Sequence, residues 1–312
     1  MSKDLETLFL KIKEFIPDTR IFTNEKMSQH TTFKIGGAAD LFVEIANVAE
    51  LQKVLVSLKE TGLTSLNKDY FIIGNGSNIL VSDEGIRGVV LHLSKEFADI
   101  QVRENTLVCQ AGATLAAIAR RAYENELTGF EFAAGIPGTL GGAIVMNAGA
   151  YDGEMKQVVK SVKLMTPDGD IIEKTNDGMK FSYRHSLLKE EQYIVLEVEL
   201  ELEKGNAEDI KAKMDDLAYK RRSKQPLEYP SAGSTFKRPE GYFAAKLIDD
   251  AGLRGYSVGD AQVSDKHCGF VINKGKATAN DVYTLIQDVQ KKVKLDSGVD
   301  IEPEVITIGF EF

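Results

Sequence analysis

Hydrophobic positions in the first half of the chain switch between a helical and an extended period. Apolar residues recur every three to four positions over three stretches, which predicts amphipathic helices; these cover residues 4–16, 48–61 and 114–125, with Thr114 as a candidate cap. Extended apolar stretches, predicted as strands, cover residues 39–45, 70–73, 89–93, 100–102 and 107–110. This succession of strands and helices indicates an α/β or α+β domain.

The second half of the chain carries the same mixture of elements. Pro167-Asp168-Gly169 separates two extended stretches and predicts a hairpin, because Asp-Gly is a frequent turn between strands. Predicted strands cover 158–165, 170–174, 193–202, 262–263, 269–273 and 301–308, and predicted helices cover 207–223, 241–251 and 278–293. Pro303 indicates an edge position or the start of a strand. We expect a domain boundary at Gly205-Asn206.

Length and charge limit the classes of protein to which the chain can belong. A chain of 312 residues holds about two domains of ~100–200 residues each. Its 38 basic and 47 acidic residues give a net charge of −9, which argues against non-specific nucleic-acid binding but leaves room for a local basic pocket. No apolar run is long enough for a membrane span, and the charged first residues lack a signal-peptide core.

The two cysteines give no sign of a disulfide framework or a metal site. Cys109 and Cys268 are few and far apart, and each is expected to be a small buried hydrophobic residue. We therefore expect a soluble protein of a reducing cytoplasm, with no metal, no nucleic-acid partner and no membrane partner.

The stretch 135–153 is the first candidate for chemistry. It holds six glycines and one proline, and glycine lets a ligand approach the backbone closely. Its residues 143–146 are apolar and can be buried, so the stretch differs from a flexible Gly/Ser linker. We interpret it as a wall of backbone amides against a flat or anionic ligand. A tight structural corner inside a sheet is the alternative.

A second glycine cluster, Gly74-Asn-Gly-Ser-Asn78, follows the apolar run 71–73, a predicted strand. Successive free amides at such a turn form an anion cradle, which favours the ligand-binding interpretation of both clusters. The spacing is not the dinucleotide fingerprint, because Ile79 stands where the third glycine belongs and the following residues look extended. A nucleotide phosphate is therefore expected here without a nicotinamide-binding domain of that type.

Five segments, taken in order, resemble the UDP-N-acetylenolpyruvoylglucosamine reductase family, flavoenzymes of peptidoglycan precursor synthesis. They are Gly74-Asn-Gly-Ser-Asn78, Gly135-Ile-Pro-Gly138 with Met146-Asn-Ala-Gly149, Tyr183-Arg-His-Ser186, Ala232-Gly-Ser-Thr-Phe-Lys237 and Glu302-Pro-Glu-Val305. The resemblance runs from about residue 31 to residue 309. It implies an α+β fold, with a two-subdomain FAD-binding domain of the vanillyl-alcohol-oxidase type over 1–205. An α+β substrate-binding domain follows over 206–312.

The resemblance also implies the cofactors and the activity. FAD would be bound non-covalently, although His30, His92, His185 and His267 are available for attachment. NADPH would be the co-substrate of a reaction that reduces UDP-N-acetyl-3-O-(1-carboxyvinyl)-glucosamine to UDP-N-acetylmuramate. The protein would act as a monomer. The implied pyrophosphate contacts are Gly74, Asn75, Gly76, Ser77 and Asn78, and the implied flavin and ribityl contacts are Gly135, Ile136, Pro137, Gly138, Gly142, Ala143, Asn147, Ala148 and Gly149.

Three catalytic residues follow from the family's motifs. Arg184 would polarise the enolpyruvyl carboxylate, which its planar donor fork fits, although a surface salt bridge is the usual fate of arginine. Ser234, rather than Ser231, would be the proton donor, although serine beside glycine is most often a turn residue. Glu304, rather than Glu302, would hydrogen-bond the developing enediolate, against the alternative of an exposed charge.

Substrate contacts are expected from Tyr183, Lys237 and Arg238, the two cations holding the UDP diphosphate. One branch of the family has an inserted loop that brings a tyrosine over the substrate. Here Arg184 to Tyr193 is only ten residues, so the chain resembles the shorter branch. The alternatives to the reductase are another flavin oxidoreductase or oxidase on the same fold, and a flavin or UDP-sugar binder without turnover.

Overall fold

The chain folds as two units, each assembled from separate stretches of sequence, in a computed structural model that describes residues 2–93 and 95–310. Unit one contains the chain up to Thr23, Asp40–Gly74 and Gly88–Tyr219. Unit two contains Asn24–Ala39, Asn75–Arg87 and the chain from Lys220 onward. The units change inside a helix rather than at Gly205-Asn206, and the functional division into 1–205 and 206–312 stays a prediction.

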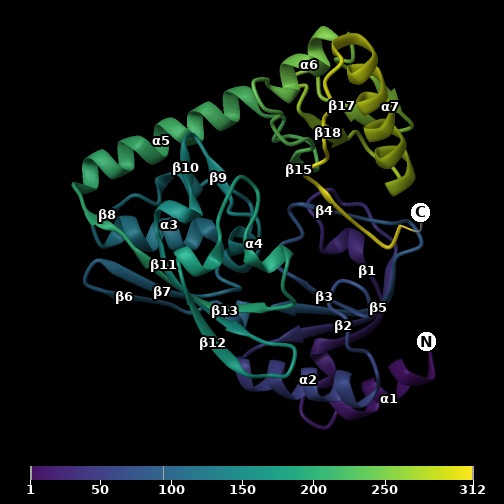
Figure 1. Cartoon of the computed structure of the whole chain (residues 1–312), viewed down its shortest axis with the longest axis vertical. Coiled ribbons are helices and arrows are strands. Elements are labelled where there is room, and N and C mark those ends of the chain that lie inside the picture. The colour runs from purple at the N-terminus through teal and green to yellow at the C-terminus, as the bar shows by residue number, and fades with distance from the viewer. Residues whose placement is uncertain (1, 94, 311–312) are drawn as a thin grey trace. The chain divides into compact units, whose positions relative to one another are not determined.

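The first layer of unit one is a sheet with two helices on one side (Figure 1). The strands lie in the order β1-β2-β5-β3; they are β1 (Ile21–Lys26), β2 (Ala38–Ile45), β5 (Ile86–Leu93) and β3 (Tyr70–Ile73). The helices are α1 (Lys3–Ile12) and α2 (Val48–Glu60). Helix α1 ends four residues before the predicted end at Ile16, yet Ile16 is still buried.

The second layer of unit one is an antiparallel sheet in the order β12-β11-β13-β7-β6. Its strands are β6 (Ile100–Arg103), β7 (Thr106–Gln110), β11 (Val159–Met165), β12 (Ile171–Thr175) and β13 (Ile194–Glu201). The predicted hairpin at Pro167-Asp168-Gly169 joins β11 to β12. Helix α3 (Leu115–Glu124) begins after Thr114, whose hydroxyl accepts from the Ala117 amide as the sequence predicts. These elements confirm the mixed α and β expectation.

Short elements complete unit one and connect the chain. The strands are β8 (Leu127–Thr128), β9 (Gly149–Ala150), β10 (Gly153–Glu154) and β14 (Glu203–Lys204). The 3₁₀ turns within residues 2–93 and 95–310 are Asp18–Arg20, Met27–Gln29, Lys95–Phe97, Glu131–Ala133, Met155–Gln157, Asp177–Met179 and Leu187–Lys189. The sequence did not predict the short helix α4 (Leu140–Val145), which lies inside the glycine-rich stretch. Part of the expected amide wall is therefore helical.

Helix α5 (Ala207–Lys224) is highly charged, and Ile210 is its only fully buried residue. The helix is held to unit one partly through Lys213, whose Nζ lies 3.1 Å from Oε2 of Glu131. Glu131 is 3% exposed and also accepts from the Thr128 hydroxyl at 2.6 Å. Burial alone raises the pKa of Glu131, but the hydrogen bonds from Thr128 and Lys213 outweigh it and leave the pKa below its ordinary value.

Replacing Glu131 with glutamine should lower the free energy of unfolding at neutral pH by about 1–3 kcal/mol, because a buried charged acceptor and the ion pair to Lys213 are lost. Since the folded pKa of Glu131 lies below its unfolded value, its stabilisation is present above that value and fades as the pH falls through the folded pKa. Urea unfolding of both proteins, at neutral pH and well below pH 4.5, measures this. If the difference in unfolding free energy between the two proteins is the same at both pH values, Glu131 is not ionised in the folded protein as described.

Unit two is built on an antiparallel sheet in the order β15-β18-β17-β16. Its strands are β15 (Ser231–Ser234), β18 (Phe270–Asn273), β17 (Ala261–Val263) and β16 (Ser257–Val258). Helices α6 (Ala244–Asp250) and α7 (Ala279–Ser297) lie beside these strands (Figure 1). The predicted helix 241–251 is shorter at both ends than expected. In α7 the predicted stripe is buried as expected; it is Val282, Leu285, Ile286, Val289 and Val293.

Segments from the first third of the chain complete unit two. Strand β4 (Ile79–Val81) pairs in parallel with β19 (Ile306–Ile308). The predicted strand 301–308 is therefore regular only at its end, while Pro303 makes an isolated bridge to Phe236. The Asp83 carboxylate accepts from the amides of Ala279 and Asn280 at 2.8 and 2.9 Å, at the start of α7, where negative charge is favourable. Among the described residues, no helix has both the length and the apolar character to cross a membrane.

Candidate active site

Gly74, the first residue of the cluster 74–78, meets the stretch 135–153 inside unit one. Gly74 follows β3 and packs against Thr139 so closely that a Cβ at position 74 would lie 2.0 Å from the Thr139 Oγ1. The backbone amides of Gly138, Thr139 and Gly142 donate to no acceptor within residues 2–93 and 95–310. An amide without an acceptor is costly where it is buried, as at Thr139, unless a ligand or water completes it. This part of the chain thus has donors to offer an acceptor from outside.

Arg184 occupies the tip of a tight turn in unit one. Ser182 and His185 exchange both backbone hydrogen bonds at 3.1 Å, which leaves Tyr183 and Arg184 as the two turn residues. Arg184 has a φ of +54°, a conformation that is uncommon for a non-glycine residue. Its Nη2 donates to the Gly149 carbonyl at 3.3 Å, and its guanidinium carbon lies 5.0 Å from the centre of the Tyr183 ring. The turn therefore presents a guanidinium beside the end of the glycine-rich stretch.

Two side chains fix the Arg184 turn to that stretch. Asn147 is fully buried; its Nδ2 donates to the Ser182 carbonyl at 3.0 Å, and its Oδ1 accepts from the Lys156 amide at 2.9 Å. The Ser186 hydroxyl donates to the Val145 carbonyl at 2.9 Å. The Asn147 side chain is thus already engaged by the protein, and its backbone amide donates to the Ile144 carbonyl at 3.3 Å, so its predicted cofactor contact stays a prediction.

The second predicted cradle lies in unit two, because the boundary between the units follows Gly74. Gly76 has a φ of +57°, and a Cβ there would lie 2.0 Å from the His30 carbonyl oxygen. The amides of Gly76, Ser77 and Asn78 have no acceptor in the described part of the chain. Three consecutive free amides around a left-handed residue form a concave anion-binding site. The residues present therefore fit a phosphate or pyrophosphate group.

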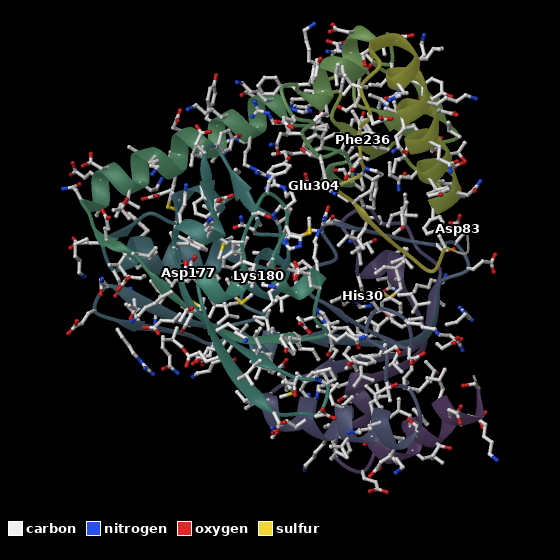
Figure 2. The ribbon with its side chains drawn as sticks, viewed as in Figure 1. His30, Asp83, Asp177, Lys180, Phe236 and Glu304 are labelled. Atoms are coloured by element: carbon white, nitrogen blue, oxygen red, sulfur yellow. The ribbon has the colours of Figure 1, made fainter. Side chains whose placement is uncertain are left out.

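Ser234 and Glu304 belong to neighbouring segments of unit two. Ser234 is exposed at the end of β15, just after Gly233, whose φ is +75°. The Glu304 amide donates to the Thr235 carbonyl at 2.8 Å, and the bridge between Phe236 and Pro303 continues this antiparallel contact. Figure 2 shows Phe236 and Glu304 on these segments. The backbone thus places the two predicted catalytic residues on adjacent stretches.

The cradle is connected to the same stretches. Asn78 donates from Nδ2 to the Glu304 carbonyl at 3.1 Å, and the Ile306 amide donates to the Asn78 carbonyl at 3.0 Å. The sequence predicted Asn78 as a cofactor donor, and the structure adds this internal role. Arg184 belongs to unit one, whereas Ser234 and Glu304 belong to unit two.

Lys237 and Arg238, the two cations predicted to bind the diphosphate, differ in their surroundings. Lys237 Nζ lies 2.8 Å from the Glu302 Oε2, and this hydrogen bond lowers the pKa of Glu302. Glu302 has a side chain 72% exposed, which suits an ionised surface carboxylate rather than a proton-sharing one. The Arg238 guanidinium carbon lies 4.0 Å from the centre of the Phe243 ring. Phe243 is 60% exposed, so this pair forms an open aromatic and cationic surface.

Sequence reasoning missed two residues that organise these features. Thr139 supports Gly74, and Thr32 donates from its hydroxyl to the Ser231 carbonyl at 2.7 Å. The polar segment 28–37 ends in paired glycines, and a Cβ at Gly37 would lie 2.1 Å from the Asp83 carbonyl oxygen. The paired glycines were the available signal that this segment packs tightly against another part of the chain.

Comparison with known proteins gives two family matches. Residues 225–308 match a family described as UDP-N-acetylenolpyruvoylglucosamine reductase, C-terminal domain, and residues 39–175 match a family described as FAD binding domain. A protein of Caldanaerobacter subterraneus named UDP-N-acetylenolpyruvoylglucosamine reductase is 51% identical over 97% of this chain and 99% of its own length. A protein of the same name from Clostridioides difficile is 47% identical over 97% of this chain and 98% of its own length.

Solved structures give similar results. The UDP-N-acetylenolpyruvylglucosamine reductase of Thermus caldophilus superposes with a TM-score of 0.77 at 33% identity, covering 91% of this chain and 97% of that one. The 4-ethylphenol oxidase of Gulosibacter chungangensis superposes with a TM-score of 0.51 at 13% identity, covering 97% of this chain and 65% of that one. The second likeness is one of fold alone.

Proposed function

Because the chain belongs to the UDP-N-acetylenolpyruvoylglucosamine reductase family, we propose that it reduces UDP-N-acetyl-3-O-(1-carboxyvinyl)-glucosamine to UDP-N-acetylmuramate with NADPH. The predicted α+β fold with an FAD-binding domain is confirmed, and FAD is the cofactor. The observation that carries the proposal is the hydrogen-bonded connection, within unit two, of an amide cradle to the segments bearing Ser234 and Glu304.

FAD, when bound, would supply the hydride chemistry between NADPH and the terminal vinyl carbon of the sugar substrate. The amides of Gly76, Ser77 and Asn78 would hold its pyrophosphate, since a hydrogen bond to an ionised acceptor is roughly twice as strong as one between neutral groups. Gly74 and the stretch 135–149, with its free amides at Gly138 and Gly142, would hold the ribityl and flavin portions. We expect this binding to be non-covalent.

The chain's own side chains handle the charge and the proton. The Arg184 guanidinium would pair with the substrate carboxylate and draw electron density from the alkene. The half-buried Glu304 carboxyl would form a hydrogen bond with the same carboxylate as it becomes enolate-like. The Ser234 hydroxyl would then give its proton to the α-carbon, which completes the addition of one hydride and one proton across the double bond.

Substrate binding is assigned to residues near these groups in sequence. Lys237 and Arg238 would hold the UDP diphosphate, and Tyr183, 50% exposed, would offer its ring to the sugar nucleotide. Lys237 would exchange its partner Glu302 for the diphosphate, a change that an exposed pair makes at little cost. The chain would act as a monomer, with 1–205 as the FAD-binding domain and 206–312 as the substrate-binding domain.

We also place the reaction in the cytoplasm. Cys109 and Cys268 are both buried free thiols, and burial raises the pKa of Cys109 to about 12. Proteins of a reducing compartment keep their cysteines as thiols rather than disulfides, which agrees with this placement.

A steady-state assay separates the reductase from its rivals. The purified protein should show flavin absorbance that bleaches with NADPH, and the colour should return on addition of the enolpyruvyl sugar nucleotide without oxygen. NADPH consumption that proceeds equally with oxygen alone would favour an oxidase on the same fold. Flavin that NADPH does not bleach would favour a binder without turnover.

A further inference from the structure

The strand that carries Ser234 is an edge strand of its sheet, and two hydrogen bonds clamp it from other segments of unit two. Strand β15 pairs with β18 alone within that sheet. The Ser231 carbonyl accepts from the Thr32 hydroxyl at 2.7 Å, and the Thr235 carbonyl accepts from the Glu304 amide at 2.8 Å. Ser234 therefore lies between the two clamps along the chain.

Both clamps lead back to the amide cradle. The Thr32 amide donates to the Gly76 carbonyl at 3.2 Å, while Asn78 Nδ2 donates to the Glu304 carbonyl at 3.1 Å. Thr32 thus uses its backbone on the cradle and its side chain on β15. The hydrogen bonds form a closed ring that runs from the cradle to β15 on one side of Ser234 and returns on the other side.

The backbone between the clamps is irregular. The pairing of β15 with β18 shifts register between Ser231 and Ser234, so one extra residue is inserted there. Gly233, within this bulge, has a φ of +75°, and a Cβ built on it would meet no atom within 4 Å. A bulge redirects the side chain that follows it, which here is Ser234. The backbone hydrogen bonds between β15 and β18 do not fix this side chain by themselves. The orientation of Ser234 therefore depends on the clamps.

We propose that Thr32 is a positioning residue that couples occupancy of the cradle to the placement of the Ser234 hydroxyl. This inference rests on the proposed function, because it takes Ser234 as the proton donor and the cradle as the pyrophosphate site. An anion held by the amides of residues 76–78 restrains that loop, and Thr32 passes the restraint to Ser231. Thr32 itself touches neither substrate nor proton.

The test compares Thr32→Val, which removes the hydroxyl and keeps the side-chain shape, with Thr31→Val. The Thr31 hydroxyl donates only within its own turn, to the Ile35 carbonyl at 2.9 Å, so it is a matched control. In single-turnover experiments, Thr32→Val should slow reoxidation by the sugar nucleotide about tenfold, the effect of one lost hydrogen bond. Its solvent deuterium isotope effect should rise, NADPH-driven reduction should stay within about twofold, and Thr32→Ser should restore the rate.

A second measurement needs no turnover. In the wild type, FAD should slow hydrogen exchange at the amides of Thr235 and Lys237, which donate to the Gly269 and Glu302 carbonyls. That protection should be lost in Thr32→Val and kept in Thr31→Val. If valine at position 32 prevents folding, Thr32→Ala is measured in the same way.

The coupling is overturned if Thr32→Val reoxidises at the wild-type rate with an unchanged isotope effect. It is also overturned if FAD protects the Thr235 and Lys237 amides equally in both variants, or if both half-reactions fall together. Failure of the wild-type flavin to reoxidise with the sugar nucleotide would instead refute the proposed function. In that case the hydrogen-exchange measurement still decides whether FAD binding protects the Thr235 and Lys237 amides through Thr32.

Discussion

Replacing Ser234 with alanine should leave flavin reduction by NADPH within about twofold of the wild type and slow reoxidation by the enolpyruvyl sugar by roughly 10²–10⁴-fold. The hydroxyl supplies a proton only after hydride has reached the substrate, so the first half-reaction does not need it. Ser234 is exposed at the end of β15 and its removal leaves no buried cavity. Stopped-flow absorbance of each half-reaction measures the two rates separately.

Ser231 provides the control for this prediction. It lies on the same strand three residues earlier, and its carbonyl, rather than its hydroxyl, accepts the hydrogen bond from Thr32. Ser231→Ala should keep most of the reoxidation rate. A large loss there with little loss in Ser234→Ala would move the proton donor to Ser231, and equal losses in both half-reactions of Ser234→Ala would end the donor assignment.

Replacing Gly76 with alanine should lower FAD affinity by roughly 100-fold or more, because the new Cβ adds strain of about 1–3 kcal/mol and displaces the cradle. The φ of +57° disfavours a side chain, and the Cβ would lie 2.0 Å from the His30 carbonyl oxygen, which belongs to the backbone and cannot simply rotate away. The apo-protein, titrated with FAD and followed by quenching of flavin fluorescence, gives the dissociation constant.

Gly62 and Gly169 separate backbone strain from displacement of the cradle. Both have positive φ, +78° and +89°, and a Cβ on either would meet no atom within 4 Å. Gly62→Ala and Gly169→Ala should therefore lower stability slightly and leave FAD affinity unchanged. If Gly76→Ala binds FAD as tightly as these two variants do, the pyrophosphate does not lie on residues 76–78.

Elements with a strong local period could be predicted from the sequence. Helix α7 shows why, because Thr278 caps it and an unbroken apolar stripe faces the core. Helix α4 was missed because Gly141 and Gly142 lower its helical propensity, and it forms only because Leu140 and Ile144 are fully buried. Periodicity therefore predicts what local patterning dictates and misses what tertiary burial imposes.

The candidate site divides in the same way. The glycine motifs and the segments bearing Arg184, Ser234 and Glu304 could be identified because their residue order resembles a family. Their supports could not be identified, since the Thr32 hydroxyl reaches a carbonyl 199 residues away and Asn78 reaches one 226 residues away. Neither contact leaves a trace in the local sequence, so only the folded structure shows that cradle and strand are tied together.

The parallel pairing of β4 with β19 has a consequence for biosynthesis. Contacts between segments this distant, such as Asn78 and Glu304 at 226 residues, carry a loop-closure cost of roughly 5 kcal/mol and form slowly. On the ribosome, residues 76–78 emerge long before their partners in 302–308. Tight binding of FAD therefore waits until residues 302–308 have emerged. Nascent chains halted before residue 302 should show no flavin absorbance.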